Sequence, residues 1–230
     1  MTKYVMVIDT ETANGLEMPL PYDFGGLVLN TQTGEVVRTF SFVCAEVFLD
    51  KQLMTSAYYS EKVPQYWKQI KTGERQLKKL LNIRKAVHEL LDEFGIKRVF
   101  AYNMGFDRRS SNNDCRMYTD FVKWFFPYGI ELLDIWHACC ESLLNTKKYC
   151  KWAEKNGFVS EKGNIQTSAE VAYKYLTNDL TFKEEHKGLE DCQIEATLLM
   201  NCVKRKVKME YYQINTACWR KVQKNRVQVA

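Results

Sequence analysis

The chain has 230 residues, which suits one domain with a substantial buried core. Its apolar content of 46% and charged content of 27% are ordinary for a globular protein. No apolar run is long enough to cross a bilayer, and the apolar run in the first residues is too short for a signal peptide and lacks a small-residue cleavage site. We therefore expect a cytoplasmic protein without membrane contact. Its eight cysteines form no CxxC pair, which predicts buried thiols.

The net charge of +5 is concentrated at the C-terminal end. Residues 203–230 contain eight lysines and arginines but one glutamate, whereas the rest of the chain contains 25 basic and 27 acidic residues. Aromatic residues alternate with these cations, a mixture that suits single-stranded nucleic acid because cations follow the phosphates and rings stack on bases. A solvated helix end followed by a flexible tail explains the composition equally well. We divide the chain into a domain at 1–206 and a basic tail at 207–230.

Three strands in a row are predicted in the N-terminal part of the chain. Residues 3–8 are rich in β-branched and apolar side chains and end at Asp9, and residues 24–29 and 36–44 have a similar composition. The intervening segment 30–34 has the residues of a tight turn. Strands joined by such short connections predict an antiparallel meander.

The pattern then changes from strands to alternating helices and strands. Apolar residues recur at helical spacing over 77–94, strands are predicted at 98–102 and 130–135, and a helical stretch at 118–126 lies between them. This alternation is typical of parallel crossovers. Further helices are predicted at 136–145, 147–156, 168–177 and 188–206, and an irregular insertion at 58–73. The predicted fold class is α/β, with a mixed five-stranded sheet (the three-strand antiparallel meander plus two parallel strands) flanked by helices.

Two carboxylates close the first predicted strand. Asp9 and Glu11 are two residues apart, so their side chains point to the same face. At about 4 Å and an effective dielectric of about 20, two such charges repel by about 4 kcal/mol. A divalent, oxygen-seeking cation such as Mg²⁺ or Mn²⁺ removes this cost. Taken alone, a solvated Asp-x-Glu at a strand end is the simpler interpretation.

A third carboxylate, Asp107, follows the fourth predicted strand. It is placed at the C-terminal edge of the sheet, where ligands of open α/β sheets bind. Asn103, just before it, suits either substrate binding or capping of the turn. Phe106 is interpreted as a core residue in preference to one that stacks on a base.

The last group is His186 and Asp191. Asp191 lies near the start of an apolar-periodic helix, which would hold its carboxylate on rigid structure. His186 lies five residues earlier in the preceding loop, and its ordinary pKa of about 6.5 allows it to take a proton near neutral pH. A histidine before a helix is usually structural, but one beside a fourth separated acid is a candidate general base.

Three motifs resemble those of the DEDDh family of 3′→5′ exonucleases, which includes the proofreading subunit of bacterial DNA polymerase III, ribonuclease T and oligoribonuclease. They are Ile8-Asp9-Thr10-Glu11-Thr12, Asn103-Met104-Gly105-Phe106-Asp107 and His186-Lys187-Gly188-Leu189-Glu190-Asp191. The resemblance covers about 3–203 and is weak over 50–95. Lys187 stands where the tyrosine branch of the superfamily has its tyrosine, which implies the histidine branch. Gly188 departs from the family, where alanine is commoner.

The resemblance implies a ribonuclease-H-like fold and two Mg²⁺ or Mn²⁺ ions per active site. Asp9, Glu11 and Asp191 would hold the ions, Asp107 would contact one of them, and His186 would act as general base. Those five residues are thus the expected catalytic set. The terminal nucleotide would be held by Thr10, Thr12, Asn103 and Phe106.

We therefore expect a metal-dependent 3′→5′ exonuclease that hydrolyses phosphodiester bonds at single-stranded 3′ ends and releases nucleoside 5′-monophosphates. DNA is favoured over RNA, and the class suggests proofreading and partners in replication or repair. The compact length also suits a phage-encoded version. An RNA-trimming or oligonucleotide-degrading member of the same family, and a non-catalytic nucleic-acid-binding module with this fold, remain the alternatives.

Overall fold

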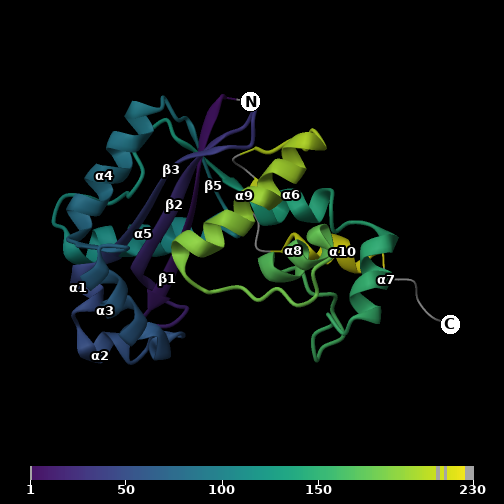
Figure 1. Cartoon of the computed structure of the whole chain (residues 1–230), viewed down its shortest axis with the longest axis horizontal. Helices are drawn as coiled ribbons and strands as arrows, with labels where there is room; N and C mark the ends of the chain where they lie inside the picture. Colours follow the sequence, from purple (N-terminus) through teal and green to yellow (C-terminus); the bar gives the residue numbers. More distant parts are fainter. Residues whose placement is uncertain (1, 211–212, 215–216, 226–230) are drawn as a thin grey trace.

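A computed structural model describes residues 2–210, 213–214 and 217–225. Six strands form one mixed sheet in the order β4-β3-β2-β1-β5-β6. Figure 1 labels β1, β2, β3 and β5 among them. The strands are β1 (Tyr4–Ala13), β2 (Leu20–Asn30), β3 (Val36–Cys44), β4 (Gln76–Lys78), β5 (Arg98–Ala101) and β6 (Glu131–Asp134). β1 and β2 pair antiparallel, as do β2 and β3, which confirms the predicted meander. β5 runs parallel to β1, and β6 parallel to β5, as expected for the crossover half.

The sheet has one strand more than predicted. β4 pairs in parallel with β3 at the edge of the sheet. Its three residues are exposed or half-buried and lie in a basic stretch, so neither an apolar run nor a clear alternation marks them as a strand. The helix expected over 77–94 consequently begins later, as α4 (Leu80–Glu93).

The first strand does not end at Asp9. β1 continues through both acids to Ala13 because β2 pairs with it along this whole length, with a register shift between Glu11 and Thr12. Asp9 and Glu11 are therefore carried on paired strand backbone and not on a loose strand end. The two carboxylates are thus held more rigidly than they would be at the strand end that the sequence predicted.

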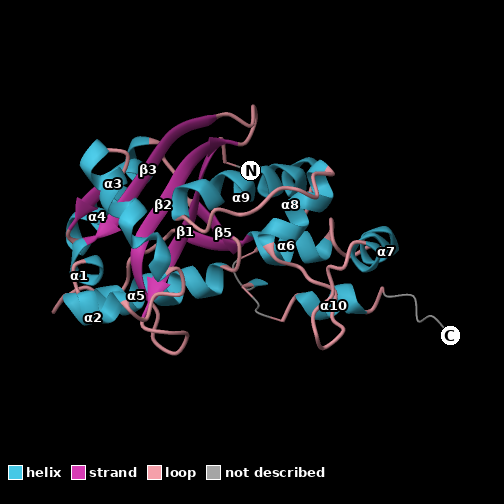
Figure 2. Cartoon of the chain, turned by 60° about the horizontal axis from the view of Figure 1, so that its bottom comes forward, coloured by secondary structure: helices cyan, strands magenta, loops and turns pink. Residues whose placement is uncertain are grey.

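Helices cover both faces of the sheet (Figures 1 and 2). One face is covered by α1 (Ala45–Phe48), α3 (Val63–Thr72), α4 and α5 (Met104–Tyr118), whose apolar side chains form a core with Met6 and Ile8 of β1. The other face is covered by α6 (Ile135–Glu141), α7 (Lys147–Lys155), α8 (Ala169–Thr177), α9 (Gly188–Lys204) and α10 (Trp219–Gln223), packed on Val5 and Val7. The alternation of β1 side chains thus supplies both cores.

Two expected elements differ from the structure. The helical stretch at 118–126 is wrong: α5 precedes it and ends at Tyr118. The insertion at 58–73 is more regular than expected, because it contains α3 and a short 3-10 turn, Ser60–Lys62, while α2 (Lys51–Met54) lies just before it. Pro64 lies in the first turn of α3, where a missing backbone N–H costs nothing.

Part of the basic tail packs on the domain. Cys218 and Val222, at α10, are buried in the same core as α6. Tyr211, Tyr212 and Arg226 lie outside the described residues, and the boundary between 206 and 207 stays a prediction. All eight cysteines are buried thiols, as expected. Among the helices that the structure describes, none is long and apolar enough to span a membrane.

Candidate active site

A cavity of about 450 Å³ lies where β1, the start of α5 and the start of α9 meet. Its lining includes eight of the nine predicted site residues: Asp9, Thr10, Glu11, Asn103, Phe106, Asp107, His186 and Asp191. Asp9 and Asp191, which are 182 positions apart in the sequence, thus meet at one place. Among the described residues predicted for the site, only Thr12, which follows the register shift in β1, does not line the cavity.

The acids are held in different ways. Asp107, in the first turn of α5, accepts hydrogen bonds through Oδ1 from the Thr10 backbone N–H (3.1 Å) and hydroxyl (2.8 Å). Asp191, in the first turn of α9, accepts through Oδ2 from the Lys187 backbone N–H at 3.2 Å. Oδ2 of Asp9 is buried without a hydrogen-bond partner among the described residues. A buried carboxylate oxygen without a partner is costly and needs a ligand to compensate it.

Burial and mutual repulsion raise the pKa of every acid in the cavity. The pKa of Glu11 rises to about 9, first through burial and then through Asp191, and that of Asp191 to about 8 through burial and nearby acids. Burial likewise raises the pKa of Asp107 to about 7. The pKa of Asp9 lies well above its ordinary value because of burial and four neighbouring carboxylates. The carboxylates can all ionise at neutral pH only with a compensating positive charge.

These residues fit a divalent cation. One ligand atom each of Glu11, His186 and Asp191 lies within 4.8 Å of the others, and the unpartnered Asp9 oxygen is buried in the same cavity. Carboxylate oxygens are the ligands that Mg²⁺ and Mn²⁺ prefer. Asp9, Glu11 and Asp191, with Asp107 beside them, therefore form a donor set suited to such ions.

His186 has an unusual environment. Its backbone is left-handed (φ +49°), and its imidazole stacks on Tyr59 with the ring centroids 4.3 Å apart and the planes 10° from parallel. Its Nδ1 lies 3.9 Å from Oε2 of Glu184. Burial, and then the nearby Lys62 cation, lower the pKa of His186. The imidazole is therefore neutral near pH 7 and able to accept a proton.

Several lining residues were missed by the sequence analysis. Glu195 is 2% exposed, accepts a hydrogen bond from the Tyr102 backbone N–H at 3.1 Å, and is one of the neighbouring acids that raise the pKa of Asp9. It lies four residues after Asp191 on α9, so helical periodicity could have placed both on one face. Tyr59 and Glu184 also line the cavity, but no sequence spacing indicated them.

The surroundings of Asn103 and Phe106 bear on the capping and core-packing roles that the sequence suggested for them. Asn103 begins α5 with a left-handed backbone (φ +73°) and makes no side-chain cap, and its Oδ1 is buried without a hydrogen-bond partner among the described residues. Phe106 is half-buried at the cavity wall, with the Arg109 guanidinium 5.5 Å from its ring centroid. It belongs to neither core, so its interpretation as a core residue is wrong.

A close backbone contact explains why glycine stands at position 188, where alanine is commoner in the family pattern. A Cβ on Gly188 would lie 2.6 Å from the Gly25 backbone nitrogen, and a Cβ on Gly25 would lie 1.9 Å from the Gly188 carbonyl carbon. The start of α9 therefore packs backbone against backbone on β2. This contact fixes where α9, and with it Asp191, meets the sheet.

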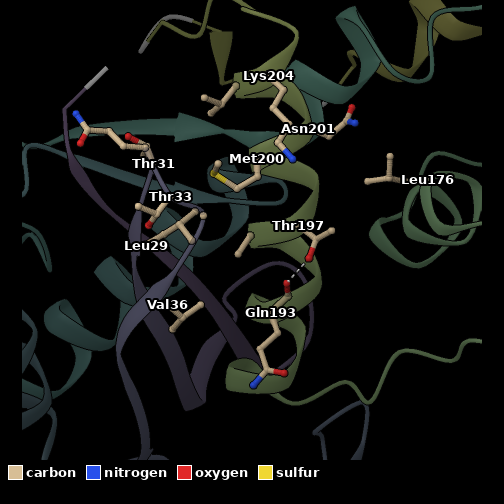
Figure 3. A pocket seen from close by; sticks show the side chains of 14 residues that line it. Leu29, Thr31, Thr33, Val36, Leu176, Gln193, Thr197, Met200, Asn201 and Lys204 are labelled. Carbon is tan, nitrogen blue, oxygen red and sulfur yellow. Dashed lines mark hydrogen bonds between the residues drawn. The ribbon is translucent and has the colours of Figure 1, made fainter.

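A larger cavity, of about 760 Å³, lies between the β2–β3 turn and α9 (Figure 3). Its lining combines apolar side chains such as Leu29 and Met200 with hydroxyl and amide groups, and Lys204 is its one charged lining residue in the described chain. It has no carboxylate or imidazole, so it lacks the groups that the chemistry of the acidic cavity requires.

No family profile and no curated protein sequence matches the chain. Several solved structures, however, have a similar fold. A 3′-exonuclease that recognises the 3′ end of histone mRNA stem-loop aligns with a TM-score of 0.57 at 14% identity, over 90% of this chain and 84% of that one. The nuclease domain of 3′hExo, a DEDDh family member bound to rAMP, aligns with a TM-score of 0.55 at 15% identity, over 91% and 96%.

Exonuclease I of E. coli, in complex with single-stranded DNA, aligns with a TM-score of 0.53 at 12% identity. The alignment covers 90% of this chain but 41% of exonuclease I. The chain therefore has the ribonuclease-H-like fold of DEDDh 3′-exonucleases. Its acidic cavity has the residue types that the three motifs predicted.

Proposed function

We propose that the protein is a metal-dependent 3′→5′ exonuclease that acts on single-stranded ends and releases nucleoside 5′-monophosphates. One observation carries the proposal: four acids and one histidine from three distant motifs line a single cavity, and one acid oxygen there is buried without a partner among the described residues. The fold shared with 3′-exonucleases that bind RNA or single-stranded DNA supports it.

Asp9, Glu11 and Asp191 would hold two divalent cations, with Asp107 contacting one of them. When bound, such ions supply Lewis acidity, which makes a water molecule more acidic and stabilises negative charge on the reacting phosphate and the leaving 3′ oxygen. The residues suit Mg²⁺ and Mn²⁺ alike, because the donors are mainly carboxylate oxygens.

The remaining residues would position and deprotonate the reactants. His186, neutral near pH 7, would take the proton from the attacking water as general base. Asn103 and Phe106 would hold the terminal nucleotide, by a hydrogen bond from the amide and by contact with the ring. The hydroxyl of Thr10 is already bonded to Asp107, so Thr10 would act mainly by fixing that carboxylate.

The basic tail would add a binding site for the strand beyond the terminal nucleotide. A cavity of about 270 Å³ beside the acidic cavity shares Thr167 and Ser168 with it and is bounded by Trp219. Arg220, exposed, follows this tryptophan on α10. An indole that can stack on a base, next to a cation that can contact a phosphate, suits single-stranded nucleic acid.

The choice between DNA and RNA depends on contacts to the 2′ position of the sugar. We propose DNA as the preferred substrate; RNA trimming is the second candidate, since one structural neighbour recognises an mRNA. Replication or repair partners, a proofreading role and a cytoplasmic location stay predictions.

The decisive experiment follows 5′-labelled DNA and RNA strands of identical sequence on a denaturing gel, with Mg²⁺, Mn²⁺ or EDTA. Stepwise shortening from the 3′ end with either ion, and none with EDTA, is expected, with DNA degraded faster. Tight strand binding without cleavage between pH 6 and 9 would instead make the protein a non-catalytic binding module.

A further inference from the structure

The loop before α9 holds His186 in a conformation that needs outside support. Residues 182–187 have no helix or strand, and His186 has φ +49°, a left-handed backbone that residues other than glycine rarely adopt. Such conformations persist where surrounding contacts impose them, and they are common at functional sites. The supporting contacts come from a part of the chain far away in sequence.

Lys62 and Tyr59 supply these contacts. The Lys62 ammonium donates hydrogen bonds to the backbone carbonyl oxygens of Glu185 and, at 3.2 Å, His186. The same ammonium lies 4.2 Å from the ring centroid of Tyr59. The Tyr59 ring also stacks in parallel on the His186 imidazole and packs edge-to-face against Tyr58, with the two tyrosine centroids 4.8 Å apart. The cation, the phenol and the imidazole thus form one layered group. Two hydrogen bonds hold the backbone and one ring contact holds the plane of the side chain.

The segment that carries these residues is itself tied to α9. The Arg75 guanidinium, 2% exposed, forms ion pairs with Asp23 of β2 (2.8 Å) and with Glu190 in the first turn of α9 (2.6 Å). Asp23 also accepts hydrogen bonds from the Tyr66 hydroxyl at 2.6 Å and the Gly188 backbone N–H at 3.0 Å. Removing one partner of a buried network of this kind leaves an uncompensated charge, so these contacts resist opening.

Together these contacts place residues 59–75 on both sides of the histidine. Before His186 in sequence, Lys62 fixes the carbonyl of Glu185; after it, Arg75 and Asp23 fix the residues that begin α9. The side chain then lies between two acidic groups, Glu11 with Asp191 and Glu170 with Glu184. An imidazole that rotated freely could pair with either group, whereas a stacked one keeps a fixed plane.

We propose that Tyr59 and Lys62 are positioning residues for His186. They hold the imidazole ring in one fixed orientation at the acidic cavity, where it can take a proton from a water molecule. This inference rests on the proposed function. It assigns a role to the segment 45–79, over most of which the resemblance to known exonucleases is weak. Neither residue is expected to contact the reacting atoms.

Kinetics of paired variants test the role. Tyr59→Leu removes the ring, Tyr59→Phe retains it, and Lys62→Met removes the ammonium; Tyr128→Leu and Lys155→Met, at exposed positions, are the matched controls. With a 5′-labelled single strand and saturating Mg²⁺, we expect Tyr59→Leu and Lys62→Met to lower kcat at least about 10-fold with KM within about threefold. Tyr59→Phe and both controls should stay within about threefold of wild type.

A double-mutant cycle separates positioning from substrate contact. In a His186→Ala background the general base is gone, so Tyr59→Leu should lower the residual rate no further. An equal loss in both backgrounds, or a rise in KM alone, would overturn the proposal and make Tyr59 a substrate-binding residue. Equal loss in Tyr59→Phe and Tyr59→Leu would overturn it as well, since stacking would then not be what matters.

A measurement that does not depend on catalysis completes the test. The chain has three histidines, so the ring-proton NMR signals of labelled histidine can be assigned with His186→Ala. In metal-free protein the His186 signal should be shifted upfield by the Tyr59 ring, should keep this shift in Tyr59→Phe and should lose it in Tyr59→Leu. An unchanged signal in Tyr59→Leu would overturn the proposal even in an active enzyme. An inactive wild type with the shifted signal would instead overturn the proposed function.

Discussion

Asp9 is the carboxylate whose environment most requires a ligand. Its pKa is raised by burial and neighbouring acids, so the metal-free protein disfavours its charged form, and its Oδ2 has no partner in the described chain. Asparagine has nearly the same shape as a protonated aspartate. We expect Asp9→Asn to abolish cleavage while leaving the melting temperature of the metal-free protein equal or higher. Calorimetry in EDTA checks this, and a large fall in melting temperature would make Asp9 a structural residue.

His186 is the second residue whose replacement separates functions. General-base catalysis contributes about 10²–10⁴ in rate, so His186→Ala should lower kcat by about that factor. The proposed ligands Asp9, Glu11 and Asp191 remain, so the affinity for Mn²⁺, measured by titration calorimetry, should change much less. A nearly normal rate would show that another group deprotonates the water.

The raised pKa values also give stability a pH dependence of defined sign. Glu11 and Asp191 titrate at about 9 and about 8 in the folded protein, against about 4 in the unfolded chain. The folded protein therefore keeps protons that the unfolded chain has released, and its stability falls as the pH rises towards 9. Above pH 7 the lowered histidine pKa values no longer contribute.

The measurement is the melting temperature in EDTA between pH 7 and 9. It should decrease with pH, Asp191→Asn should flatten the decrease, and the increase on adding Mg²⁺ should grow over the same range. A melting temperature that rises with pH would contradict the raised pKa values.

At the scale of the elements, the contact between α9 and β2 depends on two glycines. A methyl group on Gly188 would collide with the Gly25 backbone, which cannot move without disturbing the pairing of β2 with β1. We expect Gly188→Ala to cost about 1–3 kcal/mol of unfolding free energy, as overpacking does, and to lower activity by displacing Asp191. Urea denaturation and the gel assay measure the two effects.

Gly95→Ala is the control for this prediction. Gly95 has φ +60° and nothing within 4 Å of an added Cβ. Its substitution therefore adds only the left-handed backbone cost of about 1 kcal/mol and should leave activity unchanged. Equal effects of the two variants on activity would show that the contact at Gly188 does not position the site.

Some helices and strands could be predicted from the sequence and others could not. The meander was predicted because β1–β3 are long apolar runs separated by turn residues. α5 was missed because much of its buried face is polar: Ser110, Ser111, Asn112, Asn113 and Asp114 are all buried, so apolar residues do not recur at helical spacing. β4 is too short to show any pattern.

The acids were found because each lies within a short motif next to a pattern that the sequence shows: Asp9 and Glu11 follow an apolar run, Asp107 follows the strand predicted at 98–102, and Asp191 lies near the start of a periodic helix. Tyr59 and Lys62 could not be found in this way. Lys62 meets the backbone of Glu185 and His186 across 123 and 124 positions of sequence, and both partner atoms are carbonyl oxygens that any residue type would supply. Only the folded chain shows which lysine reaches them.

At the scale of the whole molecule, the excess positive charge of the C-terminal tail can be tested for a role in binding single-stranded nucleic acid. Deleting the tail would remove the buried Cys218 and Val222, so loss of folding and loss of binding could not be told apart. Exposed charges are the better target. We expect Arg220→Gln with Lys224→Gln to weaken binding of a single strand and to reduce the slope of log K against log salt by about 0.7 for each phosphate that these cations neutralise.

Fluorescence anisotropy of a labelled oligonucleotide in EDTA, between 50 and 300 mM salt, measures this slope without cleavage. Lys155→Gln is the control. Lys155 is an exposed lysine of α7 that does not line the cavity beside Trp219, so removing its positive charge should leave the slope unchanged. If the tail variant also kept the wild-type slope, its charges would lie off the path of the strand. The exposed ring of Tyr58, which packs on Tyr59 at the acidic cavity, would then be the next candidate contact to test for the strand.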